Sequence, residues 1–193
     1  MTGQLKLKKG DSLILEAGRI ASKCYSYYRN YSDSFLLEQV SRNLSLGINK
    51  IDGSQLGLKG TSVKIYKNFQ ENSITVLDQI TQQPCIYKDS LFLFNWIIQN
   101  DTISILGFTC QKANTYFRGR NYTAWFTNEI PVNNGPLKFG GLPGLILSIH
   151  DDKNKFYFEC SSVEFLKQKL PITFEEKKYT KLTREEYRKT NAI

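Results

Sequence analysis

One thiol and one imidazole in this sequence could carry out nucleophilic chemistry together. His150 is the only histidine in the chain, and Asp151 and Asp152 follow it directly. Cys110 could supply a thiolate if His150 lay beside it and one of these carboxylates oriented the ring. A serine close to His150 could replace the thiol. A lone histidine at a strand end is usually a surface or structural residue, so we assign no catalytic residue from the sequence.

Two arginines and two aromatic residues are candidates for ligand binding. Arg118 and Arg120 flank Gly119, and on one face of a hairpin end their guanidinium groups could clamp a carboxylate. The alternative is a solvated hairpin end. Trp125, close to Tyr122, could line a ligand groove or pack in the core as strand aromatics usually do.

A Pro- and Gly-rich stretch follows these residues. Three of the five prolines and four of the thirteen glycines lie between positions 131 and 144. Pro143 and Gly144 fit the two central positions of a type II turn. Their neighbours Leu142 and Leu145 are apolar, and an apolar turn left in water would form an exposed patch. We therefore expect it to be covered by the fold itself, by a partner or by a ligand.

Metal and cofactor chemistry finds little support in the sequence. Cys24, Cys85, Cys110 and Cys160 include no C-x-x-C pair, which argues against a zinc ribbon or a thioredoxin-like motif. A single histidine excludes a site with several His ligands, and we predict no cofactor. The four cysteines could form two disulfides, in any of three pairings, or remain reduced and buried.

Composition predicts one globular domain. The chain has 193 residues with 40% hydrophobic and 13% aromatic residues, which rules out a disordered or coiled-coil chain. We expect residues 1–193 to form a single domain with a core over about 4–175 and a polar tail over 176–193. No segment reaches the length of a transmembrane helix. The net charge is +8, but no one-faced basic stripe predicts nucleic-acid binding.

The elements that must position these residues are mainly strands. Residues 33–46 predict a helix with Leu36, Leu37, Val40 and Leu44 on one face, and residues 47–60 predict a loop. Thr183 and Glu186 predict a capping box before a short helix over 184–190. Alternating segments predict strands at 4–16, 61–69, 73–79, 85–87, 92–99 and 102–106, and hairpins at 107–127 and 145–165. The expected fold is a β-rich α+β domain: one large, curved antiparallel sheet, or a half-open barrel, with the 33–46 helix against one face.

The stretch over 141–146 reads GLPGLI, and with residues 105–113, 117–126, 129–131 and 135–140 it resembles the GLPGLI family of Gram-negative bacteria. The resemblance implies an exported, periplasmic or secreted envelope protein of unknown activity, although no signal peptide is visible in this chain. It implies, more weakly, a link to TonB-dependent uptake. The partner would then be an outer-membrane transport component or an apolar or peptide ligand. Export would favour a disulfide between Cys110 and either Cys85 or Cys160.

Three functions follow from these observations. The first is a non-enzymatic binding or accessory protein whose surface uses Arg118, Arg120, Tyr122, Trp125 and the segment Leu142, Pro143, Gly144 and Leu145. The second is a hydrolase that uses Cys110 or a serine with His150. The third is a structural component of the cell envelope.

Overall fold

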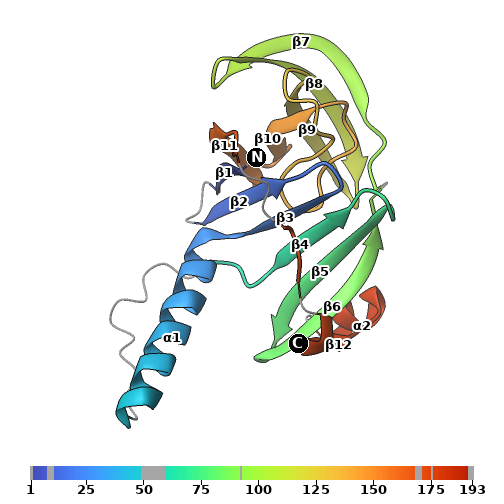
Figure 1. Ribbon diagram of the computed structural model, residues 1–193. Helices are drawn as coiled ribbons and strands as arrows, with labels where there is room; N and C mark the ends of the chain where they lie inside the picture. Colours follow the sequence, from blue (N-terminus) through green and yellow to red (C-terminus); the bar gives the residue numbers. More distant parts are fainter. Residues whose placement is uncertain are drawn as a thin grey trace.

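The computed structural model describes residues 2–7, 11–48, 60–91, 93–167, 171–174 and 176–190. Most of the predicted loop over 47–60 lies outside these residues. Within these residues, two α-helices, one short 3-10 helix and twelve strands follow one another (Figure 1). Their bounds are β1 Thr2–Leu7, β2 Ser12–Ala17, β3 Ala21–Ser26, α1 Tyr27–Leu46, β4 Lys64–Asn68, β5 Ser73–Ile80, β6 Gln83–Ser90, β7 Ile97–Ile105, β8 Phe108–Phe117, β9 Arg120–Thr127, β10 Leu145–Asp151, β11 Tyr157–Glu164, η1 Glu176–Lys178, β12 Thr180–Lys181 and α2 Arg184–Thr190.

The described strands form one curved sheet in the order β12-β6-β5-β4-β3-β2-β1-β11-β10-β9-β8-β7. Every neighbouring pair is antiparallel except β12 with β6. The two edge strands of this order, β12 and β7, do not pair with each other, so the described sheet is not a closed barrel. Figure 1 shows β7, β8 and β9 arching over one end of the sheet. The predicted fold class, a large curved antiparallel sheet with one or two helices, is confirmed.

Strand alternation places the core as the sequence predicts. In β9, Tyr122, Ala124 and Phe126 are buried on one face, whereas Asn121 on the other face is exposed. β10 is buried almost throughout, because both of its faces are covered. The predicted hairpin tip is also confirmed: Arg118 and Gly119 have φ of 50° and 79°, as a two-residue turn between antiparallel strands requires.

Sequence patterns were less accurate at the edges of other elements. Of the strands predicted at 92–99 and 102–106, residues 93–96 are not strand, and residues 97–99 and 102–105 belong to one strand, β7, with an irregular register between Ile98 and Thr102. The interruption at Asn100 and Asp101 is therefore an irregular bulge rather than a break: from Ile98 to Thr102 β7 advances four positions while β8 advances two, and an edge strand tolerates such extra residues.

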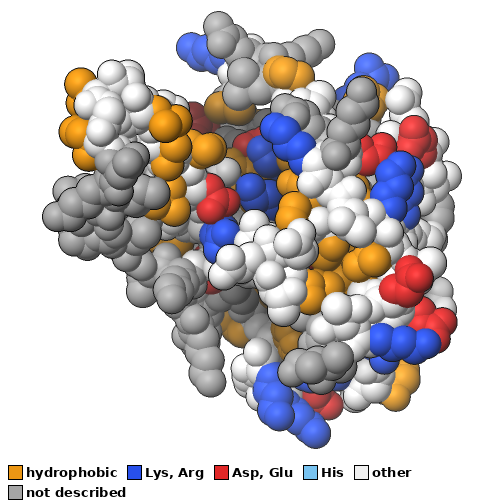
Figure 2. Space-filling model, turned by 90° about the horizontal axis from the view of Figure 1, so that it is seen from below, with side chains coloured by type: hydrophobic (Ala, Val, Ile, Leu, Met, Phe, Trp, Pro, Cys, Tyr) orange, Lys and Arg blue, Asp and Glu red, His pale blue; other side chains and the backbone are white. Residues whose placement is uncertain are grey.

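The predicted packing of the first helix is wrong. α1 begins at Tyr27, because the Ser26 side chain accepts a hydrogen bond from the Arg29 N–H and caps the helix there. Gly47 ends it with φ of 66°, as predicted. No residue of α1 is buried, and Leu37 and Leu44 are 69% and 75% exposed. Figure 2, seen from below with α1 pointing toward the reader, shows apolar side chains on this exposed surface.

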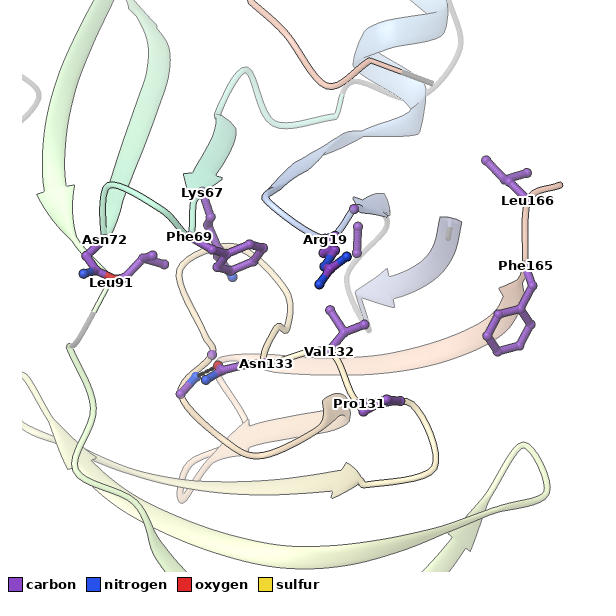
Figure 3. Close-up of a pocket in the computed structure, with 14 residues that line it drawn as sticks. Arg19, Lys67, Phe69, Asn72, Leu91, Pro131, Val132, Asn133, Phe165 and Leu166 are labelled. Atoms are coloured by element: carbon purple, nitrogen blue, oxygen red, sulfur yellow. Dashed lines mark hydrogen bonds between the residues drawn. The ribbon is translucent and has the colours of Figure 1, made fainter. Parts of the chain in front are cut away.

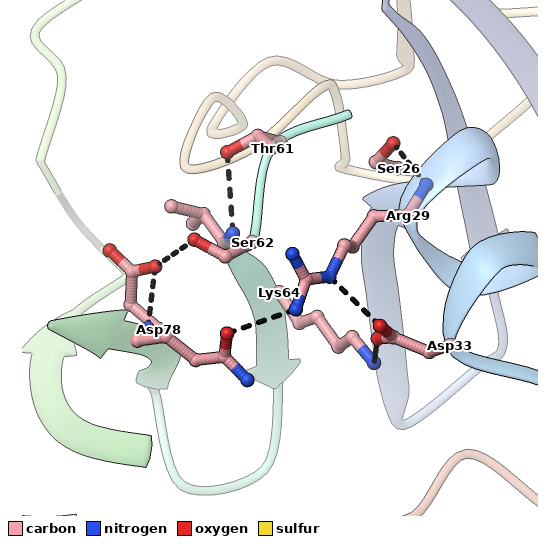
Figure 4. Close-up of polar contacts among 9 residues, drawn as sticks. Ser26, Arg29, Asp33, Thr61, Ser62, Lys64 and Asp78 are labelled. Atoms are coloured by element: carbon pink, nitrogen blue, oxygen red, sulfur yellow. Dashed lines mark hydrogen bonds and ion pairs between the residues drawn. The ribbon is translucent and has the colours of Figure 1, made fainter. Parts of the chain in front are cut away.

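Polar contacts at its first turns hold α1 to the sheet instead (Figure 4). Arg29 donates to the Gln79 side chain over 3.0 Å and pairs with Asp33 over 2.9 Å. Asp33 also lies 3.8 Å from the Lys64 ammonium on β4. A helix that these contacts hold at its N-terminal end projects from the sheet, which is the arrangement in Figure 1.

The C-terminal helix forms as predicted. The Thr183 N–H donates to Glu186 over 2.7 Å, and the Glu186 N–H donates to the Thr183 hydroxyl over 3.2 Å, which completes the capping box. Tyr187 holds α2 to the sheet: its ring lies 4.6 Å from the Tyr87 ring, and its hydroxyl donates to Asp78. Neither α1 nor α2 is long and apolar enough to cross a membrane.

Candidate functional site: a pocket beside the Pro/Gly loop

A buried lysine organises the Pro- and Gly-rich stretch over 131–144, which we call the Pro/Gly loop. Lys67 of β4 is only 2% exposed, and its ammonium donates to the Asn134 side-chain oxygen over 2.7 Å. It also donates to the backbone oxygens of Gly135 and Phe139, over 3.1 and 2.5 Å. Three N–H donors thus meet three oxygens, and the loop is held against β4.

The surroundings of Lys67 disfavour charge. Burial lowers the pKa of Lys67 to about 7. Burial likewise raises the pKa of Cys24 to about 11, so this thiol stays protonated at neutral pH. The Asn134 amide nitrogen is buried and has no hydrogen-bond acceptor among the described residues. A buried amine whose pKa lies near neutrality is a recurrent property of functional sites, so it directs attention to the loop beside it.

Two further contacts fix the far side of the loop. The Trp96 indole N–H donates to the Gly140 oxygen over 2.8 Å, and the Asn133 side chain accepts from the Gly141 N–H. In the loop, positive φ occurs at Leu137 (49°) and Gly141 (93°) and not at Gly144. A type II turn with Pro143 and Gly144 at its centre needs positive φ at Gly144, so that prediction is wrong.

Gly144 is needed for a different reason. A Cβ atom at this position would lie 2.0 Å from the Thr127 oxygen, so only glycine allows the two backbone segments to approach. Leu142 and Leu145 are 1% and 5% exposed. Of the three ways to cover the apolar turn, the structure uses the first: the fold covers it, and only Pro143 remains exposed.

The outer face of the Pro/Gly loop borders a pocket of about 670 Å³. Its walls come from the β2–β3 turn, the end of β4, the loop itself and the segment after β11. Figure 3 shows Arg19 and Phe69 extending toward Val132 and Asn133 of the loop. The lining residues are Ala17, Gly18, Arg19, Lys67, Phe69, Asn72, Leu91, Pro131, Val132, Asn133, Gly140, Gly141, Phe165 and Leu166.

The chemistry of this pocket is that of a binding site. Most of the lining is apolar, and Arg19, Asn72 and Asn133 supply a few polar groups. Such a surface suits a ligand with an apolar face and hydrogen-bonding edges. In the described part of the chain, no group of three or more His, Cys, Asp or Glu residues could hold a metal ion.

The arginines predicted to act as one clamp have separate partners. Arg120 lies 2.7 Å from the buried Asp151 carboxylate, and its guanidinium stacks on the Phe156 ring at 4.7 Å. Arg118 lies in the turn and reaches Asp89 of β6 at 3.6 Å. The two side chains therefore pair with different carboxylates of the chain itself, and a shared clamp on a ligand carboxylate stays a prediction.

The two aromatic candidates belong to the core rather than to the pocket. Tyr122 is 8% exposed and packs edge-on against Phe139 at 5.1 Å. Trp125 is partly buried on the other face of β9, with the Lys112 ammonium 5.9 Å from its ring. Of the candidates from Arg118 to Leu145, none lines the pocket beside the Pro/Gly loop.

Comparison with known proteins identifies the family. Residues 50–188 match the PNGase F-II N family, described as the N-glycanase peptide, N-terminal domain. The chain belongs to this family. No curated protein matches the sequence.

Two solved structures have the fold of this N-glycanase N-terminal domain. The structure of PNGF-II in space group C2 has a TM-score of 0.69 at 16% identity, covering 98% of this chain and 31% of that one. The structure of PNGF-II in space group P21 has a TM-score of 0.65 at 15% identity, covering 98% and 32%. The chain thus spans about a third of the length of the PNGF-II chains it matches, and at this identity the likeness concerns the fold alone.

The resemblance to the GLPGLI family is wrong, because the match over 50–188 assigns the chain to the N-glycanase N-terminal domain family. Its hexapeptide is explained by packing: Leu142 and Leu145 are core residues and Gly144 permits a close backbone approach. Any loop that closes against a strand in this way can select such residues. The expected envelope accessory protein, with its link to TonB-dependent uptake, followed from that resemblance and is wrong for the same reason.

The thiol and imidazole of the hydrolase hypothesis do not meet in this N-glycanase N-terminal domain. In the sheet, β9 lies between β8, which carries Cys110, and β10, which carries His150. Thr123 of β9 pairs with both His150 and Asn114, so the residue of β8 nearest to His150 is Asn114, four positions after Cys110. The offset of four residues corresponds to roughly 13 Å along the strands. Asp151 is paired with Arg120, as described above, and the Cys110 thiol is fully buried, with its pKa raised by burial to about 11. The Cys110–His150 pair is therefore wrong.

All four cysteines are buried free thiols in the structure. The disulfide expected between Cys110 and Cys85 or Cys160 is not formed, and the reduced alternative is the one described. Burial raises the pKa of Cys85, and it raises that of Cys160 to about 11. These thiols act as small apolar core residues.

Sequence reasoning missed Lys67, Arg19 and Phe69. Lys67 could have been found: it follows Ile65 by two residues in a strand, so it shares the face of a core residue. A lysine on an inward face requires acceptors, and that requirement is the signal. Arg19 and Phe69 lie just outside strands and carry no pattern of their own.

Proposed function

We propose that this chain is the amino-terminal domain of an N-glycanase-type enzyme and that its pocket holds part of the glycosylated substrate. Membership of the N-glycanase N-terminal domain family supports the first half. The observation that carries the second half is the pocket of about 670 Å³ beside the Pro/Gly loop.

The composition of the pocket matches a sugar. A pyranose ring has an apolar face of C–H groups and an edge of hydroxyl groups, and N-acetyl groups add an amide and a methyl. Phe69 offers a flat apolar surface, and Arg19 beside it and Asn133 on the facing loop offer polar groups (Figure 3). The volume falls within the range of pockets that hold small ligands.

The buried anchor of the loop supports the same proposal. Lys67 fixes the backbone at Gly135 and Phe139, while Trp96 fixes Gly140. One wall of the pocket is therefore rigid before any ligand arrives. A pre-formed wall lowers the entropic cost of binding, because no loop has to be ordered.

Binding of N,N′-diacetylchitobiose, the disaccharide at the base of N-linked glycans, tests the proposal. We expect saturable binding by the chain in an NMR titration, weakened about tenfold by Phe69→Ala or Arg19→Ala through loss of one ring or polar contact. Arg42→Ala is the control, because Arg42 lies on projecting α1 and its side chain is 69% exposed. Circular dichroism confirms that each variant is folded. Absence of binding by the unmodified chain, or equal weakening by Arg42→Ala, would refute the proposal.

We also propose that the chain works outside the cytoplasm, as a periplasmic or secreted protein. The family description names an N-glycanase, and N-linked glycoproteins are found mainly at cell surfaces and in secretions. Fractionation of cells that express the native gene tests this, and recovery from the cytosol alone would contradict it.

A further inference from the structure

A second pocket lies beside a cluster of positively charged side chains that surround one carboxylate. Asp89 of β6 lies 2.8 Å from the Lys138 ammonium, 3.6 Å from Arg118 and 3.7 Å from Arg184. Its side chain is only 10% exposed. The cations come from three segments far apart in the sequence: the β8–β9 turn, the Pro/Gly loop and α2.

The mouth of this pocket is formed by arginines and tyrosines. Its volume is about 360 Å³, and it is lined by Tyr87, Arg118, Arg184, Tyr187 and Arg188. The Tyr87 and Tyr187 rings lie 4.6 Å apart. The guanidinium groups of Arg118, Arg184 and Arg188 thus face one pocket, and no carboxylate is among its lining residues. So much charge of one sign attracts an anion from solution.

Asp89 does not use up the donors of the arginines. The contacts of Arg118 and Arg184 with Asp89, at 3.6 and 3.7 Å, are longer than ordinary hydrogen bonds. A guanidinium has five N–H donors, so most donors of both arginines remain available. Their side chains are 41% and 36% exposed, so a ligand can reach them. Within the described residues Arg188 has no carboxylate in ion-pair contact.

The depth of the groups gives the site a direction. Lys138 is 17% exposed and donates to both Asp89 and the Tyr87 hydroxyl, over 2.8 and 3.0 Å. Asp89 and Lys138 are not among the residues that line the pocket. An anion that enters it therefore meets guanidinium groups rather than the Asp89 carboxylate.

We propose that Arg118, Arg184 and Arg188 form a binding site for an oxyanion of a small ligand, a carboxylate or a sulfate. Planar guanidinium groups match the geometry of both oxyanions through paired N–H donors. The tyrosine rings give the rest of the ligand an apolar surface. The anion is either a free inorganic ion or the acidic group of a sugar. This site does not depend on the sugar pocket proposed above, because the two pockets share no lining residue.

Titration with sodium sulfate, N-acetylneuraminate and neutral N-acetylglucosamine, each followed by NMR, tests the proposal. We expect saturable binding of sulfate or N-acetylneuraminate, weakened by added salt, and none of N-acetylglucosamine at this site. Tighter binding of the sugar acid than of sulfate assigns the ligand to an acidic sugar, and the reverse assigns it to a free ion.

Three variants make the result specific. Arg118→Ala and Arg188→Ala should each weaken anion binding about tenfold, because each removes charge-assisted hydrogen bonds. Asp89→Asn should tighten it, because the internal anion is lost. Lys189→Ala is the control: Lys189 is on α2 but pairs with Glu185 and is 75% exposed.

Arg188→Ala keeps the proposal falsifiable if the other variants fold poorly, because it leaves the contacts of Asp89 intact. Failure of both anions to saturate the unmodified chain would overturn the proposal. So would unchanged binding in Arg188→Ala, or a loss in Lys189→Ala equal to that in Arg188→Ala.

Discussion

The ammonium of Lys67 lies 2.7 Å from the side-chain oxygen of Asn134, 67 positions away in the sequence, and both residues are almost completely buried. This contact joins β4 to the Pro/Gly loop. It determines where one wall of the pocket stands, because the same ammonium also binds two backbone oxygens of the loop.

Replacing Lys67 by methionine should loosen the loop. The change gives an unbranched apolar side chain that is one atom shorter, and it leaves the oxygens of Gly135 and Phe139 without this donor. We expect a loss of about 2–4 kcal/mol in the free energy of unfolding, from the buried acceptors left unpaired. Urea denaturation measures the loss, with Lys64→Met as a matched control, because Lys64 is on the same strand but is partly exposed. A loss no larger than that of the control would show that Lys67 does not hold the loop.

The pH dependence of stability should reveal the lowered pKa of Lys67. The pKa falls from 10.5 in an unfolded chain to about 7 in the fold. Between these values the unfolded state binds a proton that the folded state does not, so stability rises with pH. Below about pH 7 both states are protonated, and the contribution is constant.

The experiment compares the chain with its Lys67→Met variant from about pH 6 to about pH 9. The difference in unfolding free energy should move in favour of the unmodified chain above neutrality, by at most about 1.4 kcal/mol per pH unit. Using the variant as reference cancels the titration of cysteines and tyrosines. A difference that does not change with pH would mean that Lys67 keeps its ordinary pKa.

Gly144→Ala should destabilise the fold through a steric clash. The new Cβ would lie 2.0 Å from the Thr127 oxygen and 2.6 Å from its carbonyl carbon, so backbone has to move. We expect a cost of about 1–3 kcal/mol, as is typical of overpacking. Gly140→Ala is the control, because the nearest atom to its Cβ is 3.6 Å away. Equal melting temperatures for the two variants would contradict this reading of Gly144.

The sheet could be predicted from sequence further than the site could. The 107–127 hairpin, the buried face of β9 and the capping box at Thr183 follow from local patterns, and local physics decides them. The position of α1 does not follow, because it depends on Arg29 meeting Gln79, fifty positions away. The Pro/Gly loop was recognisable as unusual, but its conformation depends on Lys67. Contacts between such distant positions leave no periodic pattern in the sequence.

Arg120→Ala should lower the free energy of unfolding, because it leaves the buried Asp151 carboxylate without its cation. Asp151 is fully buried, and burial alone would raise its pKa, but hydrogen bonds from the Phe156 backbone and from Arg120 outweigh burial and lower it. Without Arg120 the carboxylate keeps the Phe156 N–H, at 3.0 Å, but loses its cation. Because Arg120 is partly exposed and its charge is screened by water, we expect a loss of about 1–3 kcal/mol near neutral pH.

The loss should depend on pH in a defined direction. Asp151 stabilises the fold above the pKa of an unfolded aspartate, and this contribution disappears as the pH falls through the lowered folded pKa. The unmodified chain and Arg120→Ala should therefore differ most near neutrality and converge in acid, as measured by urea denaturation at each pH. Thr123→Ala, on the same strand, is the control, since it removes no charge and should shift stability equally at every pH. A difference between Arg120→Ala and the unmodified chain that persisted undiminished in acid would show that Arg120 acts through packing on Phe156 and not through the Asp151 charge.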